Sequence, residues 1–184
     1  MDEKENTSIR TFTSEEKMLF SSFIQTKKDK MKLLAALDEM SLAAYTGNVV
    51  ITGEEVADTT TLATMAARAH THKKKIIFLK YYYHGDFPWA QKIDYPGITP
   101  EDVANNIIVP WFDLDALQKA YDDNNGDIAG LIAQPYDHGN FKDNEVASKE
   151  YWQSVRKWCD DHGAVLIIDD VRAGFRLDLA GSDH

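Results

Sequence analysis

The chain has a single cysteine, few basic residues and no long apolar run. Among its 184 residues, 20 are Lys or Arg and 30 are Asp or Glu, which gives a formal charge of −10 at pH 7. Nucleic acids and anionic membranes attract clustered Lys and Arg, so this charge argues against both as partners. Cys159 alone cannot form an intramolecular disulfide, and no apolar stretch approaches the length of a membrane span. The polar N-terminus lacks the apolar core of a signal peptide, so we expect a cytoplasmic protein.

Helices and strands are predicted to alternate along most of the chain. A polar tail and a helix at 13–25, which starts at a capping box, occupy residues 1–27. Residues 28–184 are predicted to form one domain with helices at 28–45, 56–70, 114–124 and 148–161 and strands at 48–52, 75–80, 107–109, 128–133 and 164–169. Crossover units of this kind predict a three-layer α/β fold, in which helices flank a mostly parallel sheet.

One long segment, residues 81–98, shows no regular pattern and is rich in aromatic side chains. Its first part, Tyr81-Tyr82-Tyr83-His84-Gly85, places aromatic rings beside a glycine that permits close backbone approach. Long ordered loops in compact domains commonly form lids or ligand walls. The segment is therefore a candidate ligand wall, and the alternative is an aromatic cluster that covers the edge of the sheet.

Two carboxylates follow the last predicted strand. Asp169 and Asp170 come directly after Val165-Leu166-Ile167-Ile168, which its apolar, β-branched content predicts to be a buried strand. Ligands of open α/β sheets bind outside the carboxyl ends of the strands, so this is a candidate site. The acids could bond a protonated heteroaromatic nitrogen, hold Mg²⁺ through oxygen ligands, or pair with Arg172 or Arg176 at the surface.

A second candidate site is the turn 52–60, which leads from a predicted strand into a helix. The N-terminus of a helix offers unpaired N–H groups that suit a phosphate, and the hydroxyls of Thr59 and Thr60 could add donors. Asp58 and the two glutamates at 54 and 55 bring negative charge to the same place. Those acids could instead simply complement the helix dipole.

Four short segments together carry a resemblance to one enzyme family. The stretch Asp169-Asp170-Val171-Arg172-Ala173-Gly174-Phe175-Arg176 is similar to a signature of the form Asp-Glu-Val-x-x-Gly-Phe-Arg, and Tyr83-His84-Gly85 is similar to a Tyr-His-Gly segment. Ala67-Arg68-Ala69-His70-Thr71 resembles the end of the helix that follows a phosphate loop, and Gly130-Leu131-Ile132-Ala133-Gln134-Pro135 resembles a strand that ends in Glu-Pro. Their order and approximate spacing over residues 48–184 resemble class III pyridoxal-phosphate aminotransferases, in particular the glutamate-1-semialdehyde aminomutase-like branch.

The resemblance implies a type I fold that works as a homodimer, with pyridoxal 5′-phosphate as cofactor and an amino acid or an amino-aldehyde or amino-ketone as substrate. It implies that Asp169 pairs with the pyridinium nitrogen and that Val171 and Tyr83 pack on the two faces of the ring. The backbone amides of Val56 and Ala57 would occupy the phosphate loop. The cofactor-binding residues that it implies are Val56, Ala57, Asp58, Thr59, Tyr83, His84, Asp169 and Val171.

The chain departs from the family pattern at several of these positions. Where the family has Ser-Gly-Ser/Ala-Glu/Asp-Ala, this sequence has Glu55-Val56-Ala57-Asp58-Thr59. Valine in place of glycine disfavours a positive φ and crowds a phosphate, and Glu55 would repel it. Gln134 replaces the usual glutamate, and Asp170 shortens the second acid of the signature.

The Schiff-base lysine of the family lies further beyond the aspartate than this sequence extends, and no lysine here has a matching context. We therefore expect no catalytic residue in this chain, and predict that the chain alone, as a fragment or shortened form, is catalytically incomplete. The alternative is a non-catalytic binding or assembly module that retains the core of the fold. We expect no metal site, because His70 and His72 face differently and a receiver-like domain carries its acid pair near its first strand.

Overall fold

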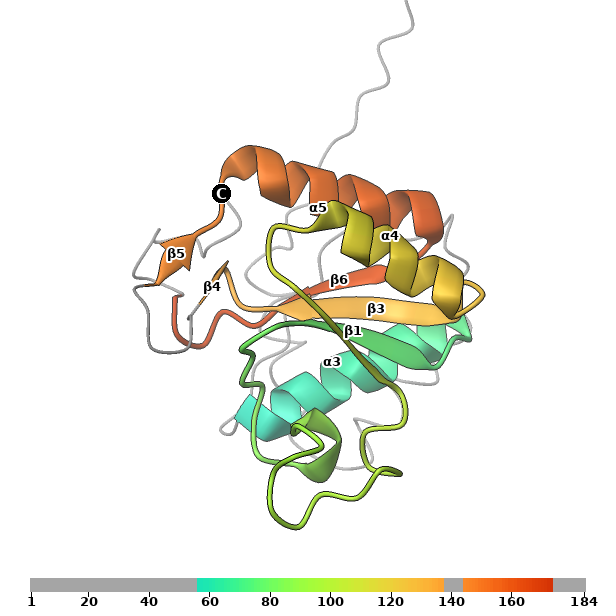
Figure 1. The fold of residues 1–184 in the computed structure, drawn as a ribbon, viewed down its shortest axis with the longest axis vertical. Coiled ribbons are helices and arrows are strands. Elements are labelled where there is room, and N and C mark those ends of the chain that lie inside the picture. Colours follow the sequence, from blue (N-terminus) through green and yellow to red (C-terminus); the bar gives the residue numbers. More distant parts are fainter. Residues whose placement is uncertain (1–55, 138–143, 174–184) are drawn as a thin grey trace, which may run out of the picture.

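The computed structural model describes residues 56–137 and 144–173. The predicted helices at 13–25 and 28–45, the strand at 48–52 and the signature residues after Ala173 lie outside the described residues. The helices are α3 (Val56–Thr71), α4 (Leu114–Asp123) and α5 (Lys149–His162), with a 3₁₀ helix, η2 (Pro88–Ala90). The strands are β1 (Lys75–Leu79), β2 (Asn106–Val109), β3 (Ile128–Ala133), β4 (Tyr136–Asp137), β5 (Glu145–Val146) and β6 (Val165–Ile168) (Figure 1).

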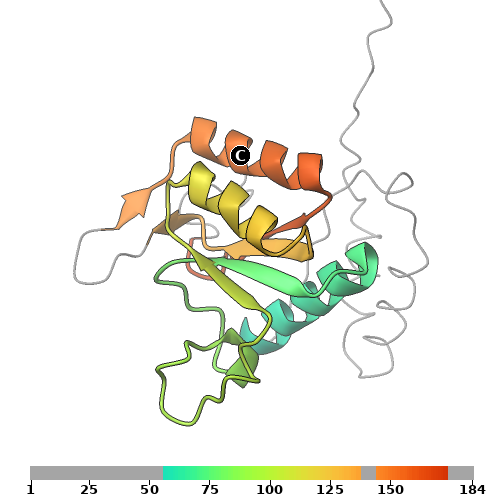
Figure 2. The ribbon, with the colours of Figure 1, turned by 45° about the vertical axis from the view of Figure 1, so that its right-hand side comes forward.

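Four of these strands form a parallel sheet in the order β2-β1-β3-β6. Ile77 of β1 pairs with Ile107 on one side and with Leu131 on the other, and Leu131 pairs with Leu166 of β6. Helix α3 covers one face of the sheet, and α4 and α5 cover the other (Figures 1 and 2). The predicted three-layer α/β fold with a mostly parallel sheet is therefore confirmed.

The core consists of two apolar layers on opposite faces of the sheet. Along β1, Ile77 and Leu79 pack in the layer that includes residues of α4 and α5, whereas Ile76 and Phe78 pack in the other layer. This alternation follows from the two-residue period of a strand. Because both faces are covered, β1 reads as a continuous apolar run, which is typical of parallel sheets.

The ends of α4 and α5 follow from local sequence. The Asp113 carboxylate accepts a hydrogen bond from the Ala116 N–H at 2.8 Å, and the Ser148 hydroxyl accepts one from the Tyr151 N–H at 3.2 Å. Helix α5 ends at Gly163, whose φ of 59° is left-handed. No helix within 56–137 and 144–173 is both long enough and apolar enough to cross a membrane.

The structure differs from the sequence-based prediction in three places. Strand β6 was predicted to be buried, but all four of its residues are partly exposed, because β6 lies at an edge of the described sheet. The segment 81–98 was predicted to lack regular structure, but it contains η2. The antiparallel pair β4–β5 was not predicted, because strands of two residues carry no periodic signal.

Candidate functional site

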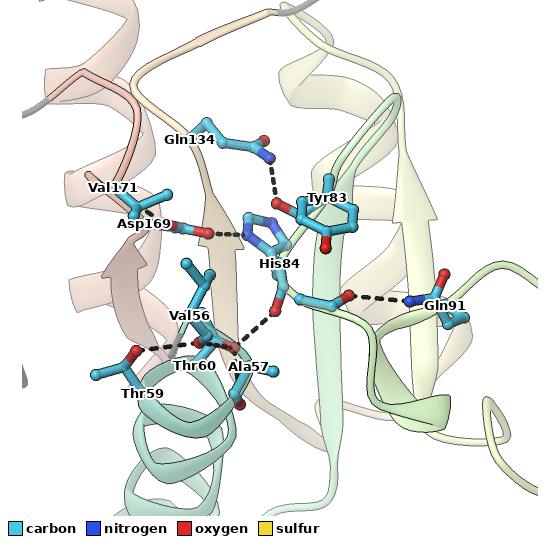
Figure 3. A network of polar contacts seen from close by, with 11 residues as sticks. Val56, Ala57, Thr59, Thr60, Tyr83, His84, Gln91, Gln134, Asp169 and Val171 are labelled. Carbon is cyan, nitrogen blue, oxygen red and sulfur yellow. Dashed lines mark hydrogen bonds and ion pairs between the residues drawn. The ribbon is translucent and has the colours of Figure 1, made fainter. Parts of the chain in front are cut away.

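Segments from three neighbouring strands and one helix meet at the carboxyl edge of the sheet. The turn Tyr83-His84-Gly85 follows β1, Gln134 follows β3 and Asp169 follows β6. Because parallel strands end at the same edge, these side chains come together although they are far apart in sequence. The first turn of α3 lies beside them (Figure 3). The convergence that the sequence predicts for Asp169, the 83–85 turn and the start of the helix is therefore seen in the structure.

The centre of the site is a buried pair of polar side chains. The Nδ1 atom of His84 lies 2.7 Å from Oδ2 of Asp169, and the two residues are 0% and 7% exposed. The other carboxylate oxygen of Asp169 accepts a hydrogen bond from the Val171 N–H at 3.3 Å. Since the carboxylate accepts, Nδ1–H of His84 is the donor of this bond. Among the described side chains, Nε2 of His84 is the one buried polar atom without a hydrogen-bond partner.

Two apolar side chains flank this pair and are open to solvent. Tyr83 is 53% exposed and Val171 is 61% exposed. In Figure 3 they lie on opposite sides of His84 and Asp169. An ionised carboxylate accepts at about four lone-pair positions, and the His84 and Val171 contacts use two of them. The arrangement therefore offers a free acceptor position between two exposed apolar surfaces.

The backbone of the Tyr83-His84-Gly85 turn is held by side chains from three different segments. Gln134 donates from Nε2 to the Tyr83 carbonyl at 2.9 Å, and the Thr60 hydroxyl donates to the His84 carbonyl at 2.7 Å. Gln91 donates from Nε2 to the Gly85 carbonyl at 2.9 Å. Each carbonyl of the turn thus has a side-chain donor, which fixes the position of His84 against Asp169 (Figure 3). The sequence carried no motif that pointed to Gln91.

The threonine hydroxyls of the first turn of α3 bond backbone carbonyls of the helix and of the adjacent turn. Thr59 donates to the carbonyl of Val56 at 3.0 Å, and Thr61 donates to the carbonyl of Ala57 at 2.6 Å. The Thr60 hydroxyl, which donates to the His84 carbonyl, also lies 2.9 Å from the carbonyl oxygen of Val56. All three hydroxyls therefore contact backbone carbonyls of the domain. Val56 is the first residue of α3, where the family pattern has glycine.

The aromatic segment after β1 covers the sheet and also borders the site. Tyr82 is buried, its ring lies 4.5 Å from that of Phe78, and it stacks on His84 at 5.7 Å. Burial, with a smaller contribution from Asp94, raises the pKa of Tyr82 to about 12. Trp89 donates from Nε1 to the Thr61 hydroxyl at 2.9 Å. Tyr82 and Trp89 thus pack inward as an aromatic cluster, whereas Tyr83 is exposed beside the His84–Asp169 pair.

The described contacts of Asp169 are with backbone and histidine donors. Asp169 is bonded to His84 and to the Val171 N–H. In the described part of the chain, no three His, Cys, Asp or Glu side chains come together in a way that could hold a metal ion. The geometry therefore favours recognition of a hydrogen-bond donor by Asp169.

The fold and this site together define an α/β domain with a buried acid at the carboxyl edge of its sheet, and the comparisons with known proteins specify it further. The chain is 40% identical over 121 residues to an aminopentol aminotransferase of Sphingopyxis macrogoltabida, covering 66% of this chain and 28% of that protein. It is 35% identical over 133 residues to a glutamate-1-semialdehyde 2,1-aminomutase of Caldicellulosiruptor saccharolyticus, covering 68% and 31%. The structure of the FumI protein of Sphingopyxis sp. MTA144 matches with a TM-score of 0.65 and 32% identity, covering 89% and 38%. No family model matches the sequence.

The chain is thus a homologue of pyridoxal-phosphate-dependent class III aminotransferases and aminomutases, and the resemblance inferred from its motifs is confirmed. It corresponds to only part of these enzymes, spanning 28% and 31% of the length of the two curated relatives. Pyridoxal 5′-phosphate is the cofactor that these relatives imply.

Proposed function

We propose that this chain forms the ring-binding part of a pyridoxal-phosphate-dependent aminotransferase or aminomutase. The observation that carries the proposal is the buried His84–Asp169 pair, which leaves an acceptor position between Tyr83 and Val171. A carboxylate placed there favours the protonated form of a heteroaromatic nitrogen. Tyr83 and Val171 would then cover the two faces of the ring.

The residues present fit the ring end of the cofactor better than its phosphate end. Asp169 would accept from the ring nitrogen, and His84 would keep that carboxylate in place. The amides of Val56 and Ala57 would face the phosphate, next to the exposed carboxylate of Asp58. When bound, the cofactor would act as an electron sink that stabilises negative charge on the carbon bearing the amino group of the substrate.

The proposal extends to the substrate class and the assembly. Because the similar proteins include an aminopentol aminotransferase and a glutamate-1-semialdehyde aminomutase, we infer an amino acid, amino-aldehyde or amino-ketone substrate. We also infer a cytoplasmic homodimer in which residues 28–184 belong to the large domain of the enzyme. Size-exclusion chromatography with light scattering tests the dimer, and a monomer at micromolar concentration would contradict it.

Ring binding is tested directly with pyridoxine and pyridoxal 5′-phosphate, using quenching of intrinsic fluorescence. Asp169→Ala should weaken the binding of both ligands about tenfold or more, because it removes the charge-assisted hydrogen bond. The matched control is Asp123→Ala, which removes an exposed carboxylate that pairs with Lys119 four residues away. Equal affinities for the wild type and Asp169→Ala would contradict the proposal.

We further propose that this chain alone does not complete the reaction. The expected result is cofactor binding without transamination and without a borohydride-reducible adduct at a defined lysine. A reducible adduct at one lysine, found by peptide mass spectrometry together with transamination, would contradict this part of the proposal. The ring-binding part would stand, because it depends on Asp169 and not on a lysine.

A non-catalytic assembly module is the second candidate function, and the partly exposed β6 favours it. The four residues of β6 lie at an edge of the described sheet and carry apolar side chains. Other protein chains commonly pair with the edge strands of a sheet or pack on exposed apolar surface. Oligomers that form equally with and without the cofactor, and that persist in Asp169→Ala, would favour this function over the first.

A further inference from the structure

We propose that Gln134 is a positioning residue that sets Tyr83 over the ring site, through a hydrogen bond that an ionised acid at this position could not donate. The inference rests on the proposed ring site, since Tyr83 has a role only if a ring stacks on it. It assigns a function to a residue at which the chain departs from the family pattern, where glutamate is usual.

Gln134 follows an interior, fully buried strand of the sheet. It directly follows β3, whose six residues are all buried, and it is itself 2% exposed. Strand β3 pairs with both β1 and β6, and the carbonyl of Ala133 accepts a hydrogen bond from the Asp169 N–H at 2.8 Å. Gln134 and Asp169 are therefore held by the same strand end. A bond from Gln134 to the turn positions Tyr83 relative to Asp169.

The turn that carries Tyr83 needs such a contact because its backbone leaves the strand abruptly. Tyr81 has a φ of 68° and Gly85 a φ of 103°, so residues in the left-handed half of φ space stand on both sides of Tyr83. Unusual backbone angles persist where surrounding contacts determine them. Thr60 and Gln91 hold the carbonyls of His84 and Gly85, and Gln134 holds that of Tyr83.

The contact needs a hydrogen-bond donor, which the amide of Gln134 has and an ionised carboxylate lacks. The Nε2 group of Gln134 donates to the Tyr83 carbonyl at 2.9 Å. An ionised glutamate has no donor, so it would face the carbonyl oxygen with a second acceptor in a buried place. A protonated glutamate has one O–H donor and could restore the bond. Burial favours that protonated form, so a glutamate variant should recover at low pH.

The experiment compares Gln134→Glu with Gln134→Met, which never has a donor. The dissociation constant for pyridoxine is measured at about pH 5 and about pH 8 and divided by the wild-type value at the same pH. At the higher pH both variants should bind about fivefold more weakly than the wild type. At the lower pH the ratio for Gln134→Glu should return toward one, while that for Gln134→Met stays unchanged. The control Gln153→Glu makes the same substitution at an exposed position of α5 and should alter neither ratio.

A second measurement reports on the surroundings of the Tyr83 side chain in the absence of ligand. The fluorine resonance of 3-fluorotyrosine placed at position 83 should shift in both variants at the higher pH and return only in Gln134→Glu at the lower pH. Gln134→Glu ratios that do not depend on pH, or a resonance that Gln134→Met leaves unmoved, would overturn the assignment. If pyridoxine fails to bind the wild type while the resonance behaves as described, the ring site fails and the Gln134 contact stands. Circular dichroism at each pH verifies that the variants are folded.

Discussion

Gly85 packs against the first turn of α3 so closely that a Cβ on Gly85 would lie 2.5 Å from the Cα atom of Ala57. The glycine also has a φ of 103°, a conformation that other residues rarely adopt. This close contact joins the turn that carries His84 to the helix end that would face a phosphate. Backbone packing therefore holds the 83–85 turn at a fixed separation from the first turn of α3.

Gly85→Ala should for this reason destabilise the fold by about 3 kcal/mol, because it adds both a backbone strain and a steric clash. Gly97→Ala is a matched control: Gly97 has a φ of 88°, but a Cβ there would meet no atom within 4 Å. Gly97→Ala should therefore lower the free energy of unfolding by the backbone strain alone, about 1 kcal/mol. Urea unfolding measures both values. Equal losses for the two variants would show that the contact with Ala57 is not tight.

The His84–Asp169 bond predicts a second effect. His84→Phe keeps an aromatic ring beside Phe78 and Tyr82 but removes the donor to the Asp169 carboxylate. A buried charged acceptor that loses a donor should cost about 2 kcal/mol of unfolding free energy and should weaken pyridoxine binding. His84→Asn places an amide donor near the position of Nδ1 and should recover part of the binding. If the asparagine and phenylalanine variants bind alike, the hydrogen bond does not position Asp169.

Much of this fold and site can be predicted because the relevant signals are local. Asp113 and Ser148 mark the starts of α4 and α5, and Gly163 marks the end of α5. Alternating helices and strands imply parallel strands, and parallel strands bring Asp169 and the 83–85 turn to one edge. These predictions need only the period of each element and the order of the elements along the chain.

The contacts that determine the geometry of the site are not local and could not be predicted. Gln134 reaches a carbonyl 51 residues away, and Thr60 reaches one 24 residues away. Buried polar groups must find partners, but which partner they find depends on the packed structure. The short strands β4 and β5 and the partial exposure of β6 were missed for a related reason. Apolar content predicts a strand but does not reveal whether that strand lies at the edge of a sheet.

Replacing Val56, the first residue of α3, with glycine should change the relative affinity for pyridoxal 5′-phosphate and pyridoxal. In Val56→Gly the branched side chain is removed and the backbone regains the conformations of the family's glycine. The ratio of the affinities for pyridoxal 5′-phosphate and pyridoxal should rise about fivefold, since the ring contributions cancel and only the phosphate contribution remains. Parallel fluorescence titrations with the two ligands measure this ratio. An unchanged or lower ratio would mean that Val56 does not crowd the phosphate.

Cys159 predicts a specific pH dependence of stability. The thiol is fully buried, and burial raises its pKa from 9.0 to about 12. The folded state therefore holds the thiol proton more tightly than the unfolded state does. The contribution of this difference to the free energy of unfolding is fully present below pH 9 and is lost as the pH rises toward 12. Tyr82 and Tyr151, whose pKa values burial raises from 10.0 to about 12, act in the same direction at higher pH.

Between pH 9 and pH 10 the thiol should therefore account for about 1 kcal/mol of the fall in unfolding free energy. Cys159→Ala should flatten the stability curve in this interval, whereas Tyr82→Phe should change the slope mainly above it. Urea unfolding in steps of pH measures both slopes. In the native wild type at about pH 8, a thiol reagent should modify Cys159 only as fast as the protein unfolds. Rapid modification under native conditions would show that the thiol is accessible and that its raised pKa does not contribute to stability.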